Sequence, residues 1–101
     1  MLTNQDQLLN LVQSLWGSIS SNFRVVWFDH DDDRVLVVHF LLERESPTDR
    51  MEIEHIMDTF STTQEDPDIK FDFTVEVSDR DISREDFTPW QAFRRREFYE
   101  S

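Results

Sequence analysis

The chain has 101 residues, which is enough for one domain with one hydrophobic core. Its 22 acidic and ten basic side chains give a formal net charge of −12. Binding to the phosphates of nucleic acid needs clustered lysine and arginine, so this charge argues against a direct nucleic-acid binder. It favours a basic protein partner instead. We therefore expect one domain, residues 1–101, that binds another protein.

Three further features limit the chemistry of the chain. Cysteine is absent, which excludes disulfides, thiol nucleophiles and cysteine-ligated metals. The one glycine, Gly17, excludes the glycine-rich loops that bind phosphate. The sequence has no apolar run of about 18 residues, and its first residues lack the basic and apolar regions of a signal peptide. We expect a cytoplasmic protein with no membrane contact and no cofactor.

The N-terminal segment is predicted to be an amphipathic helix. Thr3 is a suitable N-cap residue, and Asp6 lies three positions later as a capping-box partner. Gly17 and the serine-rich residues 18–22 are expected to end the helix. Steps of three and four residues predict one buried apolar stripe, whose members are Leu8, Leu9, Val12, Leu15, Trp16 and Ile19.

Residues 23–28 and 35–42 are rich in β-branched and aromatic side chains, and the polar residues 29–34 between them suit a hairpin turn. Regular alternation assigns the side chains of both strands to two faces. The face toward the helices is expected to hold Phe23, Val25, Trp27, Leu36, Val38, Phe40 and Leu42. The opposite face is expected to hold Arg24, Val26, Phe28, Val35, Val37, His39 and Leu41. Because this second face is also largely apolar, we expect a partner, a second copy of the chain or the C-terminal tail to cover it.

A second helix is predicted to begin after Ser46, which suits the N-cap, with Pro47 at the first helical position and Asp49 at the third. Its buried stripe is expected to comprise Ile53, Ile56, Met57 and Phe60. Residues 69–77 then alternate perfectly, which predicts a strand with five side chains toward the core: Ile69, Phe71, Phe73, Val75 and Val77.

The C-terminal region is harder to assign. Residues 78–86 are charged and predicted to be a loop, and residues 90–94 are predicted to be a short strand that begins after Pro89, with a helix as the alternative. The order α-β-β-α-β-(β) predicts an α+β fold, in which both helices pack on one face of a mainly antiparallel sheet.

Candidate metal sites and catalytic motifs are weak. Asp29, Asp31 and Asp33 match the first three ligand positions of a calcium-binding EF-hand loop, but Arg34 and Phe40 stand where glycine and glutamate are needed. The three histidines, at positions 30, 39 and 55, form no zinc motif, and no nucleophile motif is present. We expect a solvated hairpin turn, no metal and no enzymatic activity.

Acidic residues are concentrated in the middle of the chain, where residues 29–86 hold 19 acidic and six basic side chains. Such a field would steer a basic partner into contact, while aromatic anchors would supply most of the affinity. Solubility alone is the alternative explanation for the acids. The candidate partner-binding residues are Asp31, Asp32, Asp33, Glu43, Glu45, Asp72, Glu76, Asp79 and Asp81, with Trp27, Phe28 and Trp90 as the aromatic anchors.

The order of these features resembles that of a known group of proteins. A leucine-rich helix, an apolar hairpin, a Ser-Pro-Thr-Asp helix start, an alternating strand and an acidic loop precede Trp90 and the run Arg94-Arg95-Arg96. This layout is similar to that of small bacterial immunity proteins of contact-dependent growth inhibition and related polymorphic toxin systems. The resemblance implies an antidote that binds one cognate toxin domain, often a nuclease, and blocks its active or substrate-binding surface. A mimic of DNA that binds a host protein and a structural homodimer remain the alternatives.

Overall fold

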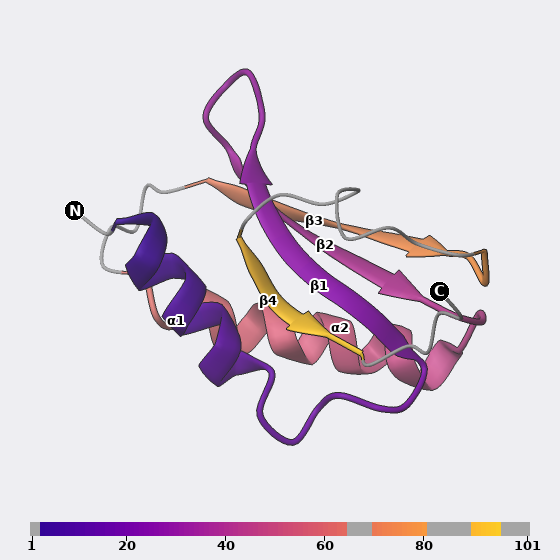
Figure 1. Ribbon diagram of the computed structural model, residues 1–101. Coiled ribbons are helices and arrows are strands. Elements are labelled where there is room, and N and C mark those ends of the chain that lie inside the picture. The colour runs from indigo at the N-terminus through magenta and orange to yellow at the C-terminus, as the bar shows by residue number, and fades with distance from the viewer. Residues whose placement is uncertain (1–2, 65–69, 81–89, 96–101) are drawn as a thin grey trace.

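Four strands form one sheet, and both helices lie against the same face of it (Figure 1). This computed structural model describes residues 3–64, 70–80 and 90–95. The elements in chain order are α1 (Asn4–Ser14), β1 (Phe23–His30), β2 (Leu36–Leu42), α2 (Pro47–Ser61), β3 (Phe71–Val77) and β4 (Gln91–Arg94). The predicted α+β class and order of elements are confirmed, including the short strand near the C-terminus.

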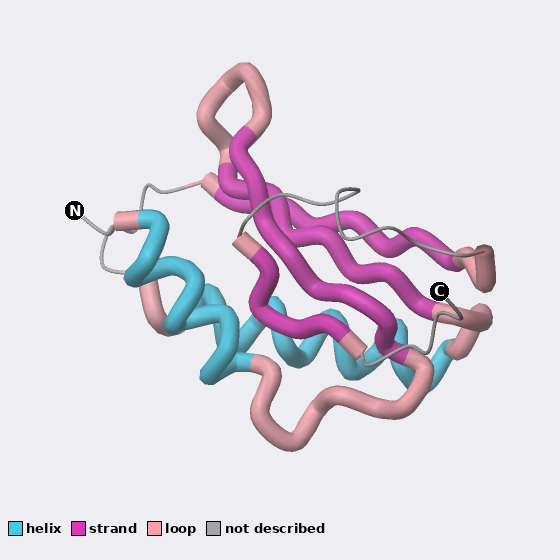
Figure 2. The backbone as a smooth tube through the Cα atoms, viewed as in Figure 1, coloured by secondary structure: helices cyan, strands magenta, loops and turns pink. Residues whose placement is uncertain are grey.

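The sheet has the order β3-β2-β1-β4 (Figure 2), and it contains both parallel and antiparallel pairs. β1 is antiparallel to both β2 and β4, whereas β3 is parallel to β2. The parallel pair follows from α2, which connects β2 to β3 and has a length of about 22 Å. That length matches the seven-residue strand β2, so the chain returns to the start of β2 before β3 begins.

Both helix starts have the predicted caps. The Thr3 hydroxyl accepts a hydrogen bond from the backbone N–H of Asp6 at 3.1 Å, and the Asp6 carboxylate accepts one from the N–H of Thr3 at 2.9 Å. The Ser46 hydroxyl accepts a hydrogen bond from the N–H of Asp49 at 3.2 Å, with Pro47 at the first helical position. These side chains satisfy backbone donors that have no partner within the helix.

The predicted buried stripe of α1 is partly wrong. The helix ends at Ser14, before Trp16, and its buried side chains are Gln7, Leu11 and Ser14, with Leu15 buried at the C-cap. Leu9 is 58% exposed and Trp16 is 78% exposed. Leu8, Leu15 and Ile19 of the predicted stripe do contact the main core, whereas Trp16 lies beyond the end of the helix.

A β-bulge in β1 reverses the predicted faces of this strand. Phe23 pairs with Leu42 and Val25 pairs with Leu41, so Arg24 is an extra residue between the two pairs. Beyond the bulge, alternation is shifted by one residue. Val26 and Phe28 therefore lie in the core beside the helices, and Val25 and Trp27 lie on the opposite face. The prediction was the reverse for all four of these residues.

The main core lies between the helices and the sheet. The predicted stripe of α2, residues Ile53, Ile56, Met57 and Phe60, is buried as expected. On β3, Phe71, Phe73 and Val75 pack against this core, as the alternation predicted, while Val77 is 37% exposed and Ile69 lies outside the described residues. Edge-on contacts of Phe60 with Phe71 and of Phe40 with Phe73 join β3 to α2 and β2.

Candidate partner-binding surfaces

The turn between β1 and β2 projects beyond the rest of the molecule (Figure 1). The Asp31 carboxylate accepts hydrogen bonds from the backbone N–H groups of Asp33 and Val35, both at 2.9 Å, and so holds the turn. Arg34 has a positive φ of 63°. Asp31, Asp32 and Asp33 are exposed, and the described part of the chain holds no cluster of side chains placed to bind a metal ion. The acids at this tip are therefore presented to solvent by a turn that one of them stabilises.

The face of the sheet opposite the helices, the outer face, is organised around a stacked pair of rings. The rings of Trp27 and His39 lie 4.9 Å apart and 18° from parallel. Nε2 of His39 is 2.8 Å from a carboxylate oxygen of Asp29, and Nδ1 is 2.8 Å from the hydroxyl of Thr74. Side chains of β1 and β3 thus hold the imidazole of β2 at both nitrogens. The indole of Trp27 is half-buried and stacks on this hydrogen-bonded imidazole.

The register of β1, β2 and β3 arranges the outer face in three rows. Nearest the hairpin turn, Asp29, Val37 and Asp72 are neighbours, and the stacked pair with Thr74 forms the middle row. The third row consists of Val25, Leu41 and Glu76. Val25 and Leu41 are buried, whereas Asp72 and Glu76 are exposed. An apolar and aromatic centre is thus bordered by carboxylates along β3.

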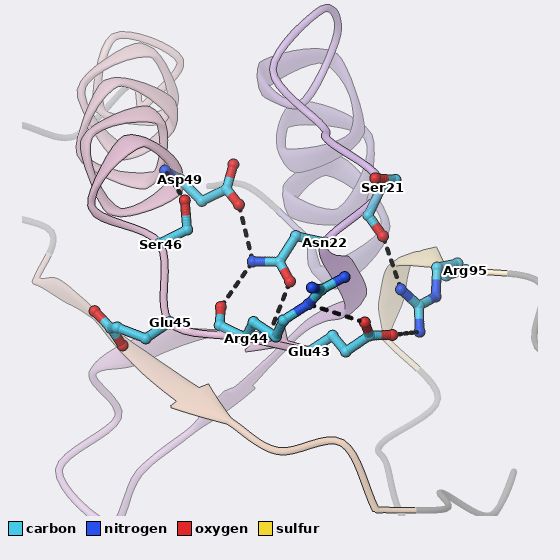
Figure 3. Close-up of a pocket in the computed structure, with 8 residues that line it drawn as sticks. All are labelled: Ser21, Asn22, Glu43, Arg44, Glu45, Ser46, Asp49 and Arg95. Atoms are coloured by element: carbon cyan, nitrogen blue, oxygen red, sulfur yellow. Dashed lines mark hydrogen bonds and ion pairs between the residues drawn. The ribbon is translucent and has the colours of Figure 1, made fainter.

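A polar cleft of about 460 Å³ lies at the other end of the hairpin, lined by Ser21, Asn22, Glu43, Arg44, Glu45, Ser46, Asp49 and Arg95 (Figure 3). Arg95 donates to the Glu43 carboxylate at 2.8 Å and to the Ser21 carbonyl at 2.7 Å. Arg44 also lies 3.4 Å from Glu43, and Arg50 forms a two-bonded ion pair with Glu45. The arginines therefore neutralise the two glutamates.

These ion pairs also affect the protonation of the glutamates. The hydrogen bond and charge of Arg95 hold the pKa of Glu43 below its ordinary value of 4.5. The hydrogen bond from Arg50 likewise lowers the pKa of Glu45. Both carboxylates remain ionised at neutral pH and are already engaged by arginines of the same chain.

Asn22 is at the centre of the cleft (Figure 3). Its amide nitrogen donates to the Arg44 carbonyl at 2.8 Å and to the buried carboxylate of Asp49 at 2.9 Å. Its amide oxygen accepts from the N–H of Arg44 at 2.9 Å. One side chain thus connects the start of β1, the end of β2 and the first turn of α2, which indicates a structural role for the cleft.

A comparison with protein families matches residues 4–97 to the model of the MafI2 immunity protein family. The chain belongs to this family of immunity proteins. The resemblance to immunity proteins of polymorphic toxin systems is therefore confirmed. None of the curated proteins compared with the chain matches it. Among the described residues of this immunity protein, no helix is long and apolar enough to cross a bilayer.

The candidate residues of this immunity protein are distributed over separate regions. Asp31, Asp32 and Asp33 occupy the hairpin tip, whereas Trp27, Asp72 and Glu76 share the outer face. Glu43 and Glu45 lie in the cleft, exposed Asp79 follows β3, and Asp81 is outside the described residues. The expected acidic surface is therefore divided among the hairpin tip, the outer face and the cleft.

Two of the three candidate aromatic anchors lie on the helix side of the sheet. Phe28 is 1% exposed, and the ring of Trp90 stacks on it at 5.8 Å and packs against the main core. The prediction of Phe28 as an exposed aromatic is wrong because the bulge at Arg24 turns it inward. Trp27 alone of the three belongs to the outer face.

The sequence interpretation missed the contacts that organise both surfaces. The sequence indicated that His39 is a hydrogen-bonded histidine within a strand, which is confirmed, but not that its partners are Asp29 and Thr74. It also gave no indication of Asn22 or of the pairing of Arg95 with Glu43. These contacts join residues from different elements, and only the register and the packing bring them together.

Proposed function

We propose that this protein neutralises one cognate toxin by binding it directly, without catalysis, and by covering the active or substrate-binding surface of the toxin. Membership of an immunity protein family, over residues 4–97, is the observation that carries this proposal. An inhibitor of this kind acts through a stable one-to-one complex, so its amount must match that of the toxin. The proposed location is the cytoplasm, where the protein would meet an incoming toxin.

The charge of the chain favours a toxin that acts on nucleic acid. Such a toxin needs a basic groove for the phosphate backbone, and a protein of net charge −12 is attracted to the same groove. Exposed carboxylates at Asp31, Asp32, Asp33, Asp72 and Glu76 extend from the hairpin tip along β3. Complementary charge of this kind raises the association rate and disfavours partners without a basic surface.

The test uses candidate toxin domains taken from the genes that neighbour the gene of this chain. Bacteria that express the toxin domain alone should stop growing, and co-expression of this chain should restore growth. With purified proteins, cleavage of RNA or DNA by the toxin should fall in proportion to added inhibitor and stop at one equivalent. An unrelated protein of the same size and net charge is the control, since it detects inhibition by charge alone.

Two results would contradict the proposal. The first is a toxin that binds this chain no better than it binds the acidic control protein. The second is capture of a host nucleic-acid-binding protein, with micromolar or tighter affinity, in place of the toxin domain, which would favour a mimic of DNA.

A further inference from the structure

The outer face of the sheet carries an inference about where the toxin binds, and this inference rests on the function proposed above. We propose that the toxin docks on the outer face, with Trp27 as the aromatic anchor and the carboxylates of Asp29, Asp72 and Glu76 around it. The matching patch of the toxin would carry arginine or lysine side chains. Three properties of the described residues support this assignment.

The first property is the position of the outer face. Both helices pack on the other face of the sheet, where they contribute to the main core (Figure 1). Trp27 and His39 are half-buried and Thr74 is exposed, so the middle row of the outer face keeps surface that a partner can contact. Aromatic side chains at the centre of an interface contribute more binding energy than most other types.

The second property is the rigidity of the Trp27 ring. Its stacking partner, His39, is held at both ring nitrogens, by Asp29 from β1 and by Thr74 from β3. A side chain that is already fixed loses little conformational entropy when a partner binds. The network therefore restrains the Trp27 ring before a partner binds. An exposed indole without a stacking partner would lose more conformational entropy on binding.

The third property is the charge around Trp27. No described basic side chain forms an ion pair with Asp72 or Glu76, and their carboxylates are exposed. In the cleft, by contrast, arginines of the chain already neutralise Glu43 and Glu45. Arg94 of β4 lies opposite Val25 on the same face and Lys70 directly precedes β3, so the negative charge open to a partner there is that of Asp72 and Glu76. An arginine of the partner would also be attracted to the face of the indole.

A second tryptophan provides a matched control. Trp16 is 78% exposed, more than Trp27, but it follows α1 in a stretch, residues 7–22, that contains no charged side chain. It has no fixed stacking partner among the described ring contacts and no carboxylate beside it in sequence. If exposure alone determined binding, Trp16 would matter more than Trp27.

The experiment measures the affinity and association rate of purified variants for the candidate toxin domain of the test above. Trp27→Ala should raise Kd by about tenfold or more, whereas Trp16→Ala should change it by less than about twofold. The double variant Asp72→Asn/Glu76→Gln should slow association by about threefold to tenfold at low salt and weaken its salt dependence. The double variant Glu54→Gln/Asp58→Asn removes the same charge from the exposed side of α2 and should leave association nearly unchanged.

The results separate the two proposals. If the wild-type chain does not bind the toxin domain, the proposed function fails. If it binds and the outer-face variants bind equally well, or if the Trp16 and α2 variants bind more weakly than they do, the docking proposal alone fails. Light scattering adds a third outcome: a wild-type dimer that Trp27→Ala converts to a toxin-binding monomer would assign the outer face to self-association and overturn the proposal. The paired carboxylate variant keeps shape and volume, so it tests the surface even if Trp27→Ala lowers stability.

Discussion

Replacing Asn22 with alanine tests whether this one amide ties β1, β2 and α2 together. The substitution removes two hydrogen bonds to the backbone of Arg44 and one to the carboxylate of Asp49. A hydrogen bond between neutral groups contributes about 1 kcal/mol net, and one to a charged group contributes about 1.5–3 kcal/mol. Water replaces part of this loss because Asn22 is only half-buried, so we expect the free energy of unfolding to fall by about 3 kcal/mol.

Urea unfolding followed by tryptophan fluorescence measures this loss. With a slope of about 2 kcal/mol per molar urea, the midpoint should fall by about 1.5 M, and the melting temperature by more than about 12 °C. Asn10→Ala is the control, because the side chain of Asn10 on α1 makes no hydrogen bond in the described part of the chain. Its stability should be unchanged or slightly raised, since alanine favours the helix.

A double-mutant cycle with Asp49→Ala isolates the bond between the two side chains. We expect the two losses to sum to more than the loss of the double variant, because the hydrogen bond between Asn22 and Asp49 is lost in either single variant. A change of less than about 0.5 kcal/mol for Asn22→Ala would refute the reasoning, since surface substitutions without a structural role fall in that range.

Three further changes test other parts of the fold. Ser46→Ala removes the N-cap of α2 and should lower the free energy of unfolding by about 1 kcal/mol, whereas Ser46→Asp keeps an acceptor and should not. Because Arg95 lowers the pKa of Glu43, the stabilisation is present above the ordinary value of 4.5 and is lost as pH falls through the folded-state pKa. Melting temperatures of wild type and Glu43→Gln should therefore differ at neutral pH and converge in acid; a constant difference would contradict this. Phe40→Ala should lower the free energy of unfolding, measured with urea, by about 3–5 kcal/mol, because Phe40 is 0% exposed. A loss below about 1 kcal/mol would contradict this and would mean that the core collapses around the gap.

The features that were predicted correctly are encoded by neighbours in sequence. The caps at Thr3 and Ser46 depend on residues at most three positions away, and the alternation of residues 71–77 is complete within one strand. Helix α2 combines a strong start with a clear stripe, so its bounds and its buried side were both predictable. Local signals of this kind determine the order of elements, and the order determined the fold class.

The features that were missed depend on register and on contacts between distant elements. Five of the six residues from Phe23 to Phe28 are apolar, so alternation carried no information about which side of β1 faces the helices. The bulge at Arg24 decided the faces, and it leaves no pattern in such a run. No direction was predicted for β3, whose parallel pairing with β2 follows from the crossover through α2 and not from residues 71–77 themselves.

The same bulge determines which aromatic ring a partner can meet. Without the extra residue, regular alternation would point Trp27 toward the helices, where it could not stack on His39. Phe28 would then lie on the outer face. With it, the indole lies beside the carboxylates of β3 and the phenyl ring fills the core. The net charge of −12 says only that a basic partner is favoured. Of the described acidic surfaces, which also include the hairpin tip and the exposed side of α2, the outer face is the one where the bulge places a half-buried tryptophan, Trp27.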